Sequence, residues 1–242
     1  MQLSKLESKA YETLKGNGMA IFKSKDLMLL LNADQVKAYN IIKALKKKGA
    51  IKAVKAGLYS FKEANELVIG TYLNWPSYLS FWSALSYYGF TDQLPKTIFY
   101  ATTKYRKRIN NYKYITLSKK RFFGYVKAGD MTIAEKEKAI IDSLLFPKYS
   151  GGIREIIGCF RVAADKLNAD KMADYAFRAE SKAVLRRLGF MLELTGYKGS
   201  ILKKIHKKIG KGYELLDPSL KKRNNLNKKW LLDINYDIDR RA

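Results

Sequence analysis

The stretch NADQVKAYNIIKALKKKGAIKAVKAGLYSF, residues 32–61, predicts a helix that is followed directly by a β-hairpin. Its first half has apolar side chains at helical spacing, and Gly49 is expected to end the helix after about Lys48. Its second half alternates around Ala56-Gly57, a pair typical of a tight turn between two strands. The stretch carries seven lysines and one acidic residue. This charge forms either a solvated surface or a surface for phosphates, and the distribution of residues around the helix distinguishes the two.

The residues before this stretch complete a small domain. Apolar residues at helical spacing predict a first helix over 3–14. A short extended piece follows, and Ser24 is expected to cap a second helix. Asn32 is expected to cap the third helix, with Gln35 as its partner in a capping box. The order helix, strand, helix, helix, hairpin predicts a winged helix-turn-helix over residues 1–62.

The third helix has two different faces on a helical wheel. The stripe that is expected to enter the core consists of Ala38, Ile41, Ile42 and Leu45. The opposite face contains no acidic residue, and it displays a valine and a tyrosine that gain little from facing water. A merely solvated face would mix Lys with Glu. The face and the hairpin therefore predict DNA-binding residues, which are Gln35, Val36, Tyr39, Asn40, Lys43, Lys46, Lys47, Lys52 and Lys55.

These residue types match the chemistry of the major groove. Apolar side chains meet the methyl group of thymine, and an asparagine such as Asn40 reads adenine. Lysines contact phosphate or guanine, and Lys52 and Lys55 of the hairpin are suited to phosphates beside the groove. The alternative is a winged helix that contacts proteins and uses its lysines for solubility.

Residues 63–242 predict a larger mixed α/β domain, attached without a flexible linker. Its first part, 63–150, combines helices with a small sheet, for which KTIFYATT, YKYITLS and RFFGYV are the strand candidates. PSYLSFWSALSYYG (76–89) is expected to be a helix that begins at its proline. MTIAEKEKAIIDSLL is expected to be a helix with Thr132 and Glu135 as a capping box.

The second part, 151–242, is predicted to be mainly helical with an extended tail. Helices are expected over 153–167, 169–178 and 180–195, and a further lysine-rich helix at GSILKKIHKKIG. The fold class expected for the whole chain is therefore α+β.

The chain has a formal net charge of +25, from 47 Lys and Arg against 22 Asp and Glu. Residues 1–61, 62–150 and 151–242 contribute +8, +7 and +10 to this net charge. DNA binding by the predicted winged helix-turn-helix would explain only the charge of the first segment. An excess of this size indicates nucleic acid or an anionic membrane surface as a partner. The uncharged stretch 67–91 is interrupted by NWP and predicts two buried helical pieces, so no membrane partner is expected.

The sequence lacks the motifs of common catalytic and metal sites. It has no glycine-rich phosphate loop, and its single cysteine and single histidine, Cys159 and His206, exclude the common zinc sites. Cys159 is expected to be a buried apolar residue, and His206 to lie on a solvated helix flank. Glu135, Glu137 and Asp142 are better explained by caps and surface ion pairs than by a nuclease site. We therefore expect a non-enzymatic protein without cofactor or metal. We also expect it to be cytoplasmic, because the cysteine content and the N-terminus give no sign of secretion.

A second basic segment lies outside the predicted winged helix-turn-helix. KYRKRINNYKYITLSKKR, residues 104–121, has eight basic residues, three tyrosines and no acid. It is either a solvated loop or a second surface for an anionic partner, either flanking DNA or an acidic or RNA-bearing protein. The residues of this possible surface are Lys104, Arg106, Lys107, Arg108, Lys119, Lys120 and Arg121.

Four stretches together resemble the AbiEi-type antitoxins, the regulator half of AbiE-type (type IV) toxin–antitoxin pairs. They are GAIKAVKAGLYSF, PSYLSFWSALSYYGFTDQLPKTIFYATT, TIAEKEKAIIDSLL and RRLGFMLELTG, and they follow one another in family order. The first is common to many winged helices, whereas the second and third in this order are more specific. The resemblance implies a winged helix that binds inverted repeats in its own promoter. It also implies a C-terminal antitoxin domain that opposes a nucleotidyltransferase-type toxin, directly or indirectly.

The function expected from the sequence is a DNA-binding autoregulator and antitoxin that binds its operator as two protomers. Two alternatives remain open at this point. One is a nucleic-acid-processing enzyme such as a nuclease, and the other is a stand-alone repressor that responds to a ligand.

Overall fold

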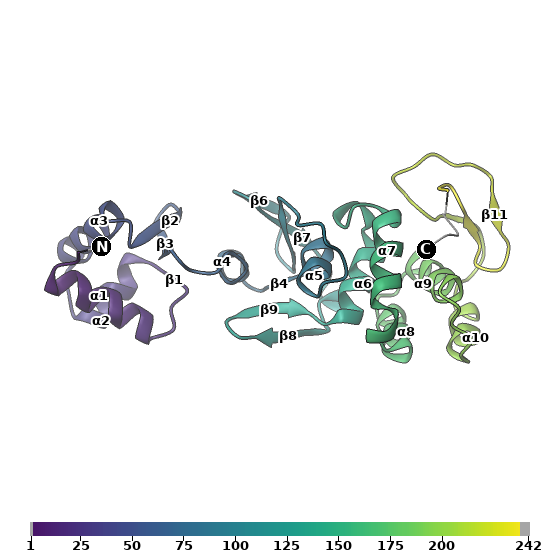
Figure 1. Cartoon of the computed structure of the whole chain (residues 1–242), viewed down its shortest axis with the longest axis horizontal. Helices are drawn as coiled ribbons and strands as arrows, with labels where there is room; N and C mark the ends of the chain where they lie inside the picture. The colour runs from purple at the N-terminus through teal and green to yellow at the C-terminus, as the bar shows by residue number, and fades with distance from the viewer. Residues whose placement is uncertain (1, 238–242) are drawn as a thin grey trace. The chain divides into compact units, whose positions relative to one another are not determined.

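The computed structural model describes residues 2–237, and the chain divides into two compact units, Met1–Leu73 and Asn74–Ala242. Both units combine helices with small sheets, so the chain is an α+β protein (Figure 1). The sequence placed the boundary at residue 62, whereas the first unit extends to Leu73. The segment after residue 62 is tied to this unit because Glu63 accepts a hydrogen bond from Tyr11.

The first unit has the element order helix, strand, helix, helix, hairpin, and ends with one further helix. Its three strands form an antiparallel sheet in the order β1-β3-β2. The apolar stripe that the wheel predicted on the third helix is confirmed, because Ala38, Ile41, Ile42 and Leu45 are all buried. The elements are α1 (Lys5–Gly16), β1 (Ile21–Phe22), α2 (Ser24–Leu31), α3 (Gln35–Lys47), β2 (Ile51–Lys55), β3 (Leu58–Phe61) and α4 (Glu66–Leu73).

Two predicted helix caps of this unit are wrong. Ser24 lies inside α2, and Lys23 precedes the helix with its backbone N–H donating to the Asp26 carboxylate at 2.6 Å. Asn32 ends α2 in the left-handed conformation, with φ of 47°. Asp34 caps α3 instead, because its side chain accepts a hydrogen bond from the backbone N–H at position 37 at 2.7 Å. A single asparagine cannot close one helix in the left-handed region and open the next from an extended conformation.

The second unit is built on a six-stranded mixed sheet in the order β6-β7-β5-β4-β9-β8. The parallel pairs are β4 with β9 and β5 with β7, and the other neighbours are antiparallel. Its strands are β4 (Ser77–Leu79), β5 (Ile98–Thr102), β6 (Lys107–Ile109), β7 (Tyr112–Thr116), β8 (Tyr125–Ala128) and β9 (Met131–Ala134).

The sheet is larger than predicted because β4, β6 and β9 are strands that the sequence did not predict, and β8 begins later than expected. Residues 77–79 form β4, and the helix α5 begins only at Phe81. Residues 131–134 form β9, so Thr132 lies in a strand and caps no helix. RFFGYV starts at Arg121, the last residue of a 3₁₀ turn, and becomes β8 only at Tyr125. β4 and most of β9 are buried, so neither segment shows the alternation by which a strand is recognised.

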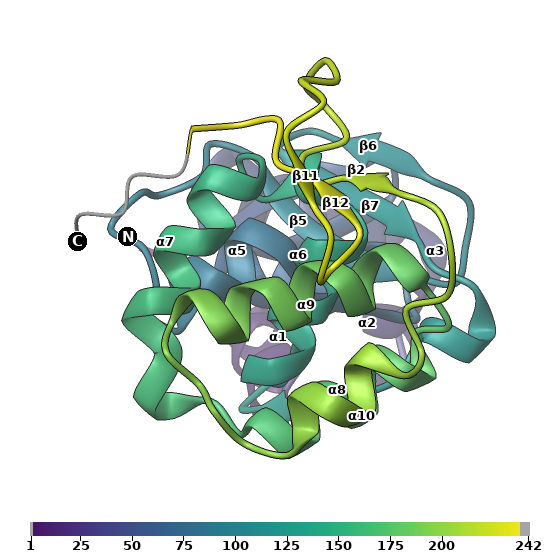
Figure 2. The same ribbon diagram turned by 90° about the vertical axis from the view of Figure 1, so that its right-hand side faces the viewer.

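The helices and the tail complete the unit. Figure 2 shows α9 crossing in front of the other helices, with α8 and α10 on one side of it and the small sheet of the tail on the other. The tail strands pair in the order β10-β12-β11. The elements are α5 (Phe81–Tyr87), α6 (Lys136–Leu145), α7 (Ile153–Ala163), α8 (Ala169–Arg178), α9 (Lys182–Leu194), α10 (Ile201–His206), β10 (Glu214–Leu215), β11 (Leu226–Asn227) and β12 (Leu232–Asp233).

Several smaller expectations are confirmed. Cys159 is buried, and burial raises the pKa of its thiol to about 12, so it behaves as an apolar residue. His206 is exposed at the end of α10. Glu135 and Glu137 form ion pairs with Lys171, as expected of structural acids. In the part of the chain that the structure describes, no helix is long and apolar enough to span a bilayer.

A buried ion pair joins α6 to the centre of the sheet, and here the prediction of a surface acid was wrong. Lys138 and Asp142 contact each other on α6 with side chains only 1% exposed. Asp142 also accepts hydrogen bonds from the Ser80 hydroxyl at 2.8 Å and the Tyr78 hydroxyl at 3.0 Å, both next to or within β4. Burial lowers the pKa of Lys138, and the charge of Asp142 opposes that change. Asp142 is therefore stabilised by Lys138 and both hydroxyl groups, and Lys138 by Asp142 and by donating to the Tyr78 hydroxyl at 3.0 Å.

We predict that Asp142→Ala destabilises the second unit by about 3–5 kcal/mol, because it leaves the Lys138 ammonium buried without a counter-charge. Replacing both charges, with Lys138→Met and Asp142→Leu, is expected to cost less than the single change. All three tryptophans lie in the second unit, so urea unfolding followed by tryptophan fluorescence reports on it. A double variant that is less stable than Asp142→Ala would contradict this account.

Candidate nucleic-acid interface

The first unit presents α3 with one face in its core and the other in solvent. The stripe of buried residues packs against α1, α2 and the hairpin strands. The outer face exposes two apolar side chains, with Val36 69% and Tyr39 58% accessible. Since no other part of the described first unit covers them, these side chains remain available to a partner.

The lysines on the outer face of α3 are not neutralised within the molecule. Lys43, Lys46 and Lys47 are exposed, and among residues 2–237 no carboxylate oxygen lies within ion-pair distance of their ammonium groups. Lys48 differs, because its ammonium lies 2.6 Å from the Glu7 carboxylate of α1. Within the described residues, the lysines of the predicted face are therefore unpaired in three dimensions as far as Lys48, but the face is not free of acids, because Glu7 and Asp34 lie beside Val36 and Asn40.

The predicted base-reading residues do not all point the same way. Val36 and Asn40 line a hollow of about 430 Å³ between α1 and α3, whose lining also includes the acidic residues Glu7 and Asp34. Tyr39 is not part of its lining. Gln35 is exposed at the first turn of the helix. On the outer face of α3, Val36 and Asn40 therefore lie beside α1, whereas Tyr39 lies farther from it.

The hairpin brings its two predicted lysines to different environments. Gly57 sits at the turn with φ of 69°, a conformation that favours glycine, and the predicted turn is confirmed. Lys55 is exposed beside this turn. Lys52 pairs with Glu66 of α4 at 2.5 Å, so part of its charge is already balanced. Of the two, Lys55 is better placed to contact a phosphate.

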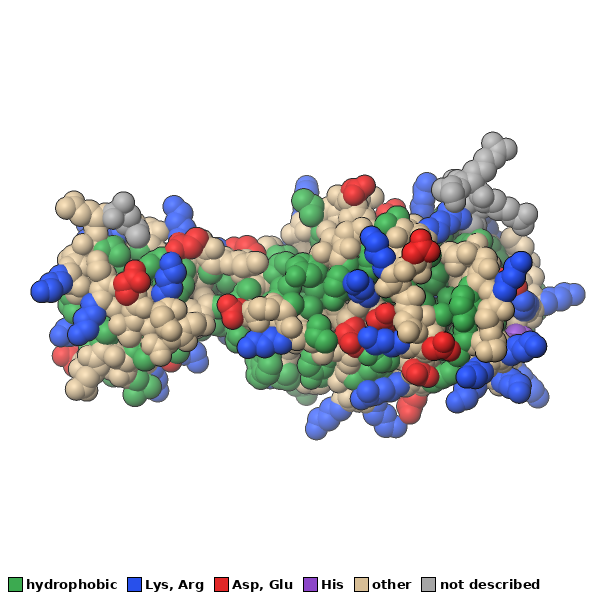
Figure 3. All heavy atoms as spheres, turned by 60° about the horizontal axis from the view of Figure 1, so that its bottom comes forward, with side chains coloured by type: hydrophobic (Ala, Val, Ile, Leu, Met, Phe, Trp, Pro, Cys, Tyr) green, Lys and Arg blue, Asp and Glu red, His purple; other side chains and the backbone are tan. Residues whose placement is uncertain are grey.

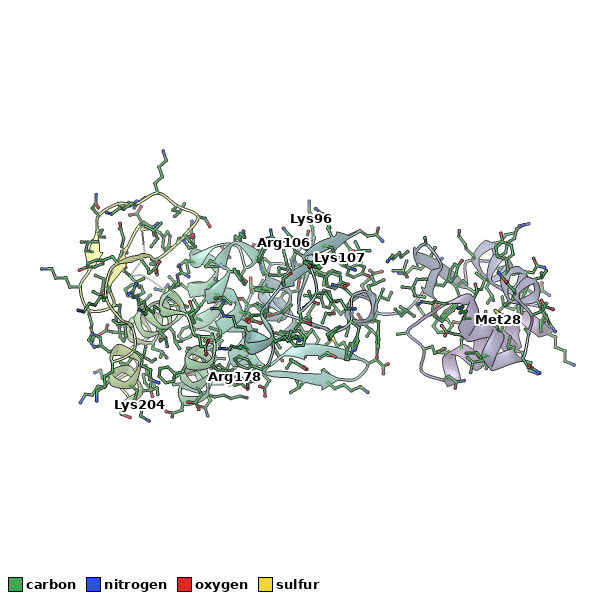
Figure 4. The ribbon with its side chains drawn as sticks, turned by 180° about the vertical axis from the view of Figure 1, so that it is seen from behind. Met28, Lys96, Arg106, Lys107, Arg178 and Lys204 are labelled. Carbon is green, nitrogen blue, oxygen red and sulfur yellow. The ribbon has the colours of Figure 1, made fainter. Side chains whose placement is uncertain are left out.

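The seven residues of the second basic segment do not form one surface. Lys104, Arg106, Lys107 and Arg108 lie just before and within β6, at one edge of the sheet. Arg106 and Lys107 are labelled there in Figure 4. Lys119, Lys120 and Arg121 lie in the 3₁₀ turn between β7 and β8.

This turn is bound to the end of α8 in the second unit. The Arg121 guanidinium donates to the Ala179 carbonyl at 2.7 Å, and Lys120 lies 3.5 Å from the Glu180 carboxylate. Arg121 thereby satisfies a carbonyl at the end of α8. Of the predicted segment, only the group at β6 remains a candidate surface for an anionic partner.

The wheel missed one residue near the interface. Lys37 is exposed in the first turn of α3, and it lines the hollow beside Val36 and Asn40. Its position next to the core stripe excluded it from the face opposite that stripe. Within residues 2–237, no group of three His, Cys, Asp or Glu side chains is arranged to hold a metal ion.

The comparisons with known proteins concern the fold alone. The chain is similar to the crystal structure of the RV2827C protein from Mycobacterium tuberculosis, with a TM-score of 0.68 and 12% sequence identity. The match covers 96% of this chain and 92% of that chain. No protein-family model and no curated protein matches the sequence. The α+β arrangement thus occurs in a protein that shares only 12% sequence identity with this chain.

The ion pair between Glu7 and Lys48 makes the stability of the first unit depend on pH. The Lys48 ammonium and the Ser4 backbone N–H hold the pKa of Glu7 below its usual range. A carboxyl group whose folded pKa is lowered stabilises the protein above its unfolded pKa, and this contribution is lost as pH falls through the folded pKa.

We therefore predict that Glu7→Gln lowers the melting temperature of the first unit at neutral pH, and that the difference from the unchanged protein shrinks as the solution is acidified. Glu12→Gln, the same change on the same helix, is the matched control. Melting is followed through the NMR methyl signals of Leu14 and Ile42, which are buried in this unit. A difference that is constant from neutral to acidic pH would refute the linkage.

Proposed function

We propose that the first unit is a winged helix-turn-helix that binds double-stranded DNA with α3 in the major groove and the β2–β3 hairpin beside it. The observation that carries this proposal is the outer face of α3. It displays Val36 and Tyr39 to solvent, together with three lysines that have no carboxylate partner in the described chain. Unpaired lysines beside exposed apolar side chains suit phosphates next to base edges.

We propose further that the whole chain is a transcriptional autoregulator and antitoxin of the AbiEi type. This step rests on the resemblance of the four stretches quoted above. The operator is an inverted repeat in the chain's own promoter, and two protomers bind it. The second unit opposes a nucleotidyltransferase-type toxin, by direct contact or through another step.

The DNA proposal is tested by gel shifts on the promoter and on random DNA across a series of salt concentrations. Lys43→Ala and Lys47→Ala are each expected to weaken binding to both DNAs and to lower the salt slope by about one. Asn40→Ala is expected to cost about 1–3 kcal/mol on the operator and little on random DNA.

The hairpin supplies a matched pair for the same experiment. Lys55→Ala is expected to weaken binding more than Lys52→Ala, because Lys52 is already paired with Glu66. Footprinting of the promoter is expected to show two protected arms about one helical turn apart, or a multiple of it. Equal losses on both DNAs for Asn40→Ala would remove its role in base reading, and a single asymmetric footprint would exclude two protomers.

The antitoxin proposal predicts that repression and rescue from the toxin separate. With the chain expressed from a foreign promoter, the double variant Lys43→Ala/Lys47→Ala is expected to lose repression and still restore growth in the presence of the toxin. The variant Lys104→Ala/Arg106→Ala/Arg108→Ala, which changes the group at β6, is the reciprocal test: if this group serves neutralisation, rescue is lost and repression is kept. If the α3 variant loses rescue at unchanged protein level, neutralisation depends on DNA binding and the division of roles is wrong.

A further inference from the structure

A second basic segment of the second unit, besides residues 104–121, surrounds α10. Residues 198–211 contain six lysines and no acidic residue. Figure 3 shows Lys and Arg side chains gathered over this end of the unit. The segment has no part in the proposed contact of α3 with DNA. Such a concentration of like charge is unfavourable unless solvent ions or a bound anion balance it.

Part of this charge surrounds a hollow. A depression of about 510 Å³ is lined by Lys198, Gly199, Leu202, Lys203, His206, Lys207 and Lys229. Four ammonium groups, one imidazole and one apolar side chain thus share one site, and its volume lies within the range of about 300–1,000 Å³ that is common for ligand sites. Within the described chain, Lys198, Lys203 and Lys207 have no carboxylate within ion-pair distance.

The wall formed by α10 is fixed by packing. Ile201, Ile205 and Ile209 are each no more than 3% exposed, so this face of the segment is anchored in the unit. Lys203 and Lys207 are one helical turn apart and line the hollow. Lys204 and Lys208 do not belong to the lining; Lys204 projects from the outside of α10 (Figure 4), and Lys208 lies over the Phe177 ring.

The opposite wall comes from the tail and is fixed by Trp230. This side chain is fully buried, and a Cβ atom added at Gly189 of α9 would lie only 2.1 Å from its ring. Its indole N–H donates to the Glu193 carboxylate at 2.6 Å, and the adjacent Lys229 pairs with the same carboxylate. The Glu193 carboxylate therefore has two donors, the Trp230 indole and the Lys229 ammonium. The His206 ring meets Trp230 edge to face, with 5.8 Å between the ring centroids.

We propose that this hollow, the α10 hollow, binds the polyphosphate group of a nucleotide. Three unpaired ammonium groups converge there and suit a compact anion with several charges better than a single carboxylate. Buried side chains hold the two walls in place, so binding costs little conformational entropy in the backbone of the walls. The same chemistry is found in a free nucleoside triphosphate and at the 5′-triphosphate end of an RNA.

The test compares two variants that remove the same charge from the same segment. Calorimetric titration of the full chain is performed with tripolyphosphate, ATP and adenosine. The first two are expected to bind and adenosine is not. Lys203→Ala/Lys207→Ala is expected to weaken binding at least about tenfold, the effect of losing charge-assisted hydrogen bonds. Lys204→Ala/Lys208→Ala, outside the hollow, is expected to change it by less than about threefold, the scale of screened surface charge.

His206 gives a second, local measurement, since it is the only histidine of the chain. Its single set of imidazole NMR signals is expected to shift on addition of tripolyphosphate to the unchanged protein and to the control variant. An RNA oligonucleotide with a 5′-triphosphate that binds more tightly than ATP would assign the site to RNA ends, and the reverse order to free nucleotides.

Three results would overturn the proposal. They are the absence of tripolyphosphate binding, equal losses in the two variants, and binding without a change in the His206 signals. An oligonucleotide with a 5′-hydroxyl end that binds as tightly as the triphosphate form would likewise show a diffuse basic surface. None of these outcomes depends on operator binding, so the α10 hollow and the DNA interface are tested separately.

Discussion

The second unit depends on the buried ion pair between Lys138 and Asp142. The pair lies on α6, and α6 packs against α5, α7, α8 and α9 as well as β9. Through the hydroxyl groups of Tyr78 and Ser80, Asp142 also fixes α6 against β4, a central strand of the sheet. A buried ion pair is a weak source of net stability, but each partner imposes a strict geometry because an unpaired charge in the interior is costly. The pair therefore fixes the position of the helix more than it adds to the stability of the unit.

The tail is held mainly by hydrogen bonds from two buried arginines to backbone carbonyls. The Arg187 guanidinium donates to the carbonyls of Leu144, Leu215 and Leu216, at 2.8–3.0 Å. Arg186 does the same to the carbonyls of Ile209 and Lys211. An irregular segment has backbone carbonyls that accept no hydrogen bond from a neighbouring strand or helix. A guanidinium group has several N–H donors in one plane, so it can donate to several of these carbonyls at once. These contacts, with Trp230 over Gly189, bring Lys229 to the α10 hollow.

The positive charge of the chain has different surroundings in different places. Where it is needed for structure, it is paired or bonded: Lys48 with Glu7, Lys171 with Glu135, and Arg121 with the end of α8. Within the described chain, it is not paired for Lys43, Lys46 and Lys47 on the outer face of α3, nor for Lys198, Lys203 and Lys207 in the α10 hollow. A surface that is basic only for solubility has no reason to collect unpaired lysines beside apolar side chains or around a hollow, and these two places are therefore the ones for which we propose ligands. A nucleotide in the α10 hollow would also make the protein responsive to a ligand, as the alternative of a ligand-responsive repressor requires.

The sequence alone determined the elements whose signals are local. The core stripe of α3, the turn at Gly57, α8 at 169–178 and the burial of Cys159 follow from spacing, backbone preference and residue type, and the structure agrees. Tertiary structure alone decided the rest. β4 and β9 are strands because a sheet buries them, although their sequences carry no strand period. Asp142 became an interior charge, and Lys203, Lys207 and Lys229 became neighbours, only through packing between segments far apart in the chain. Periodicity reports which side of an element is buried, but not which distant residues it will meet, because that depends on how all the elements pack at once.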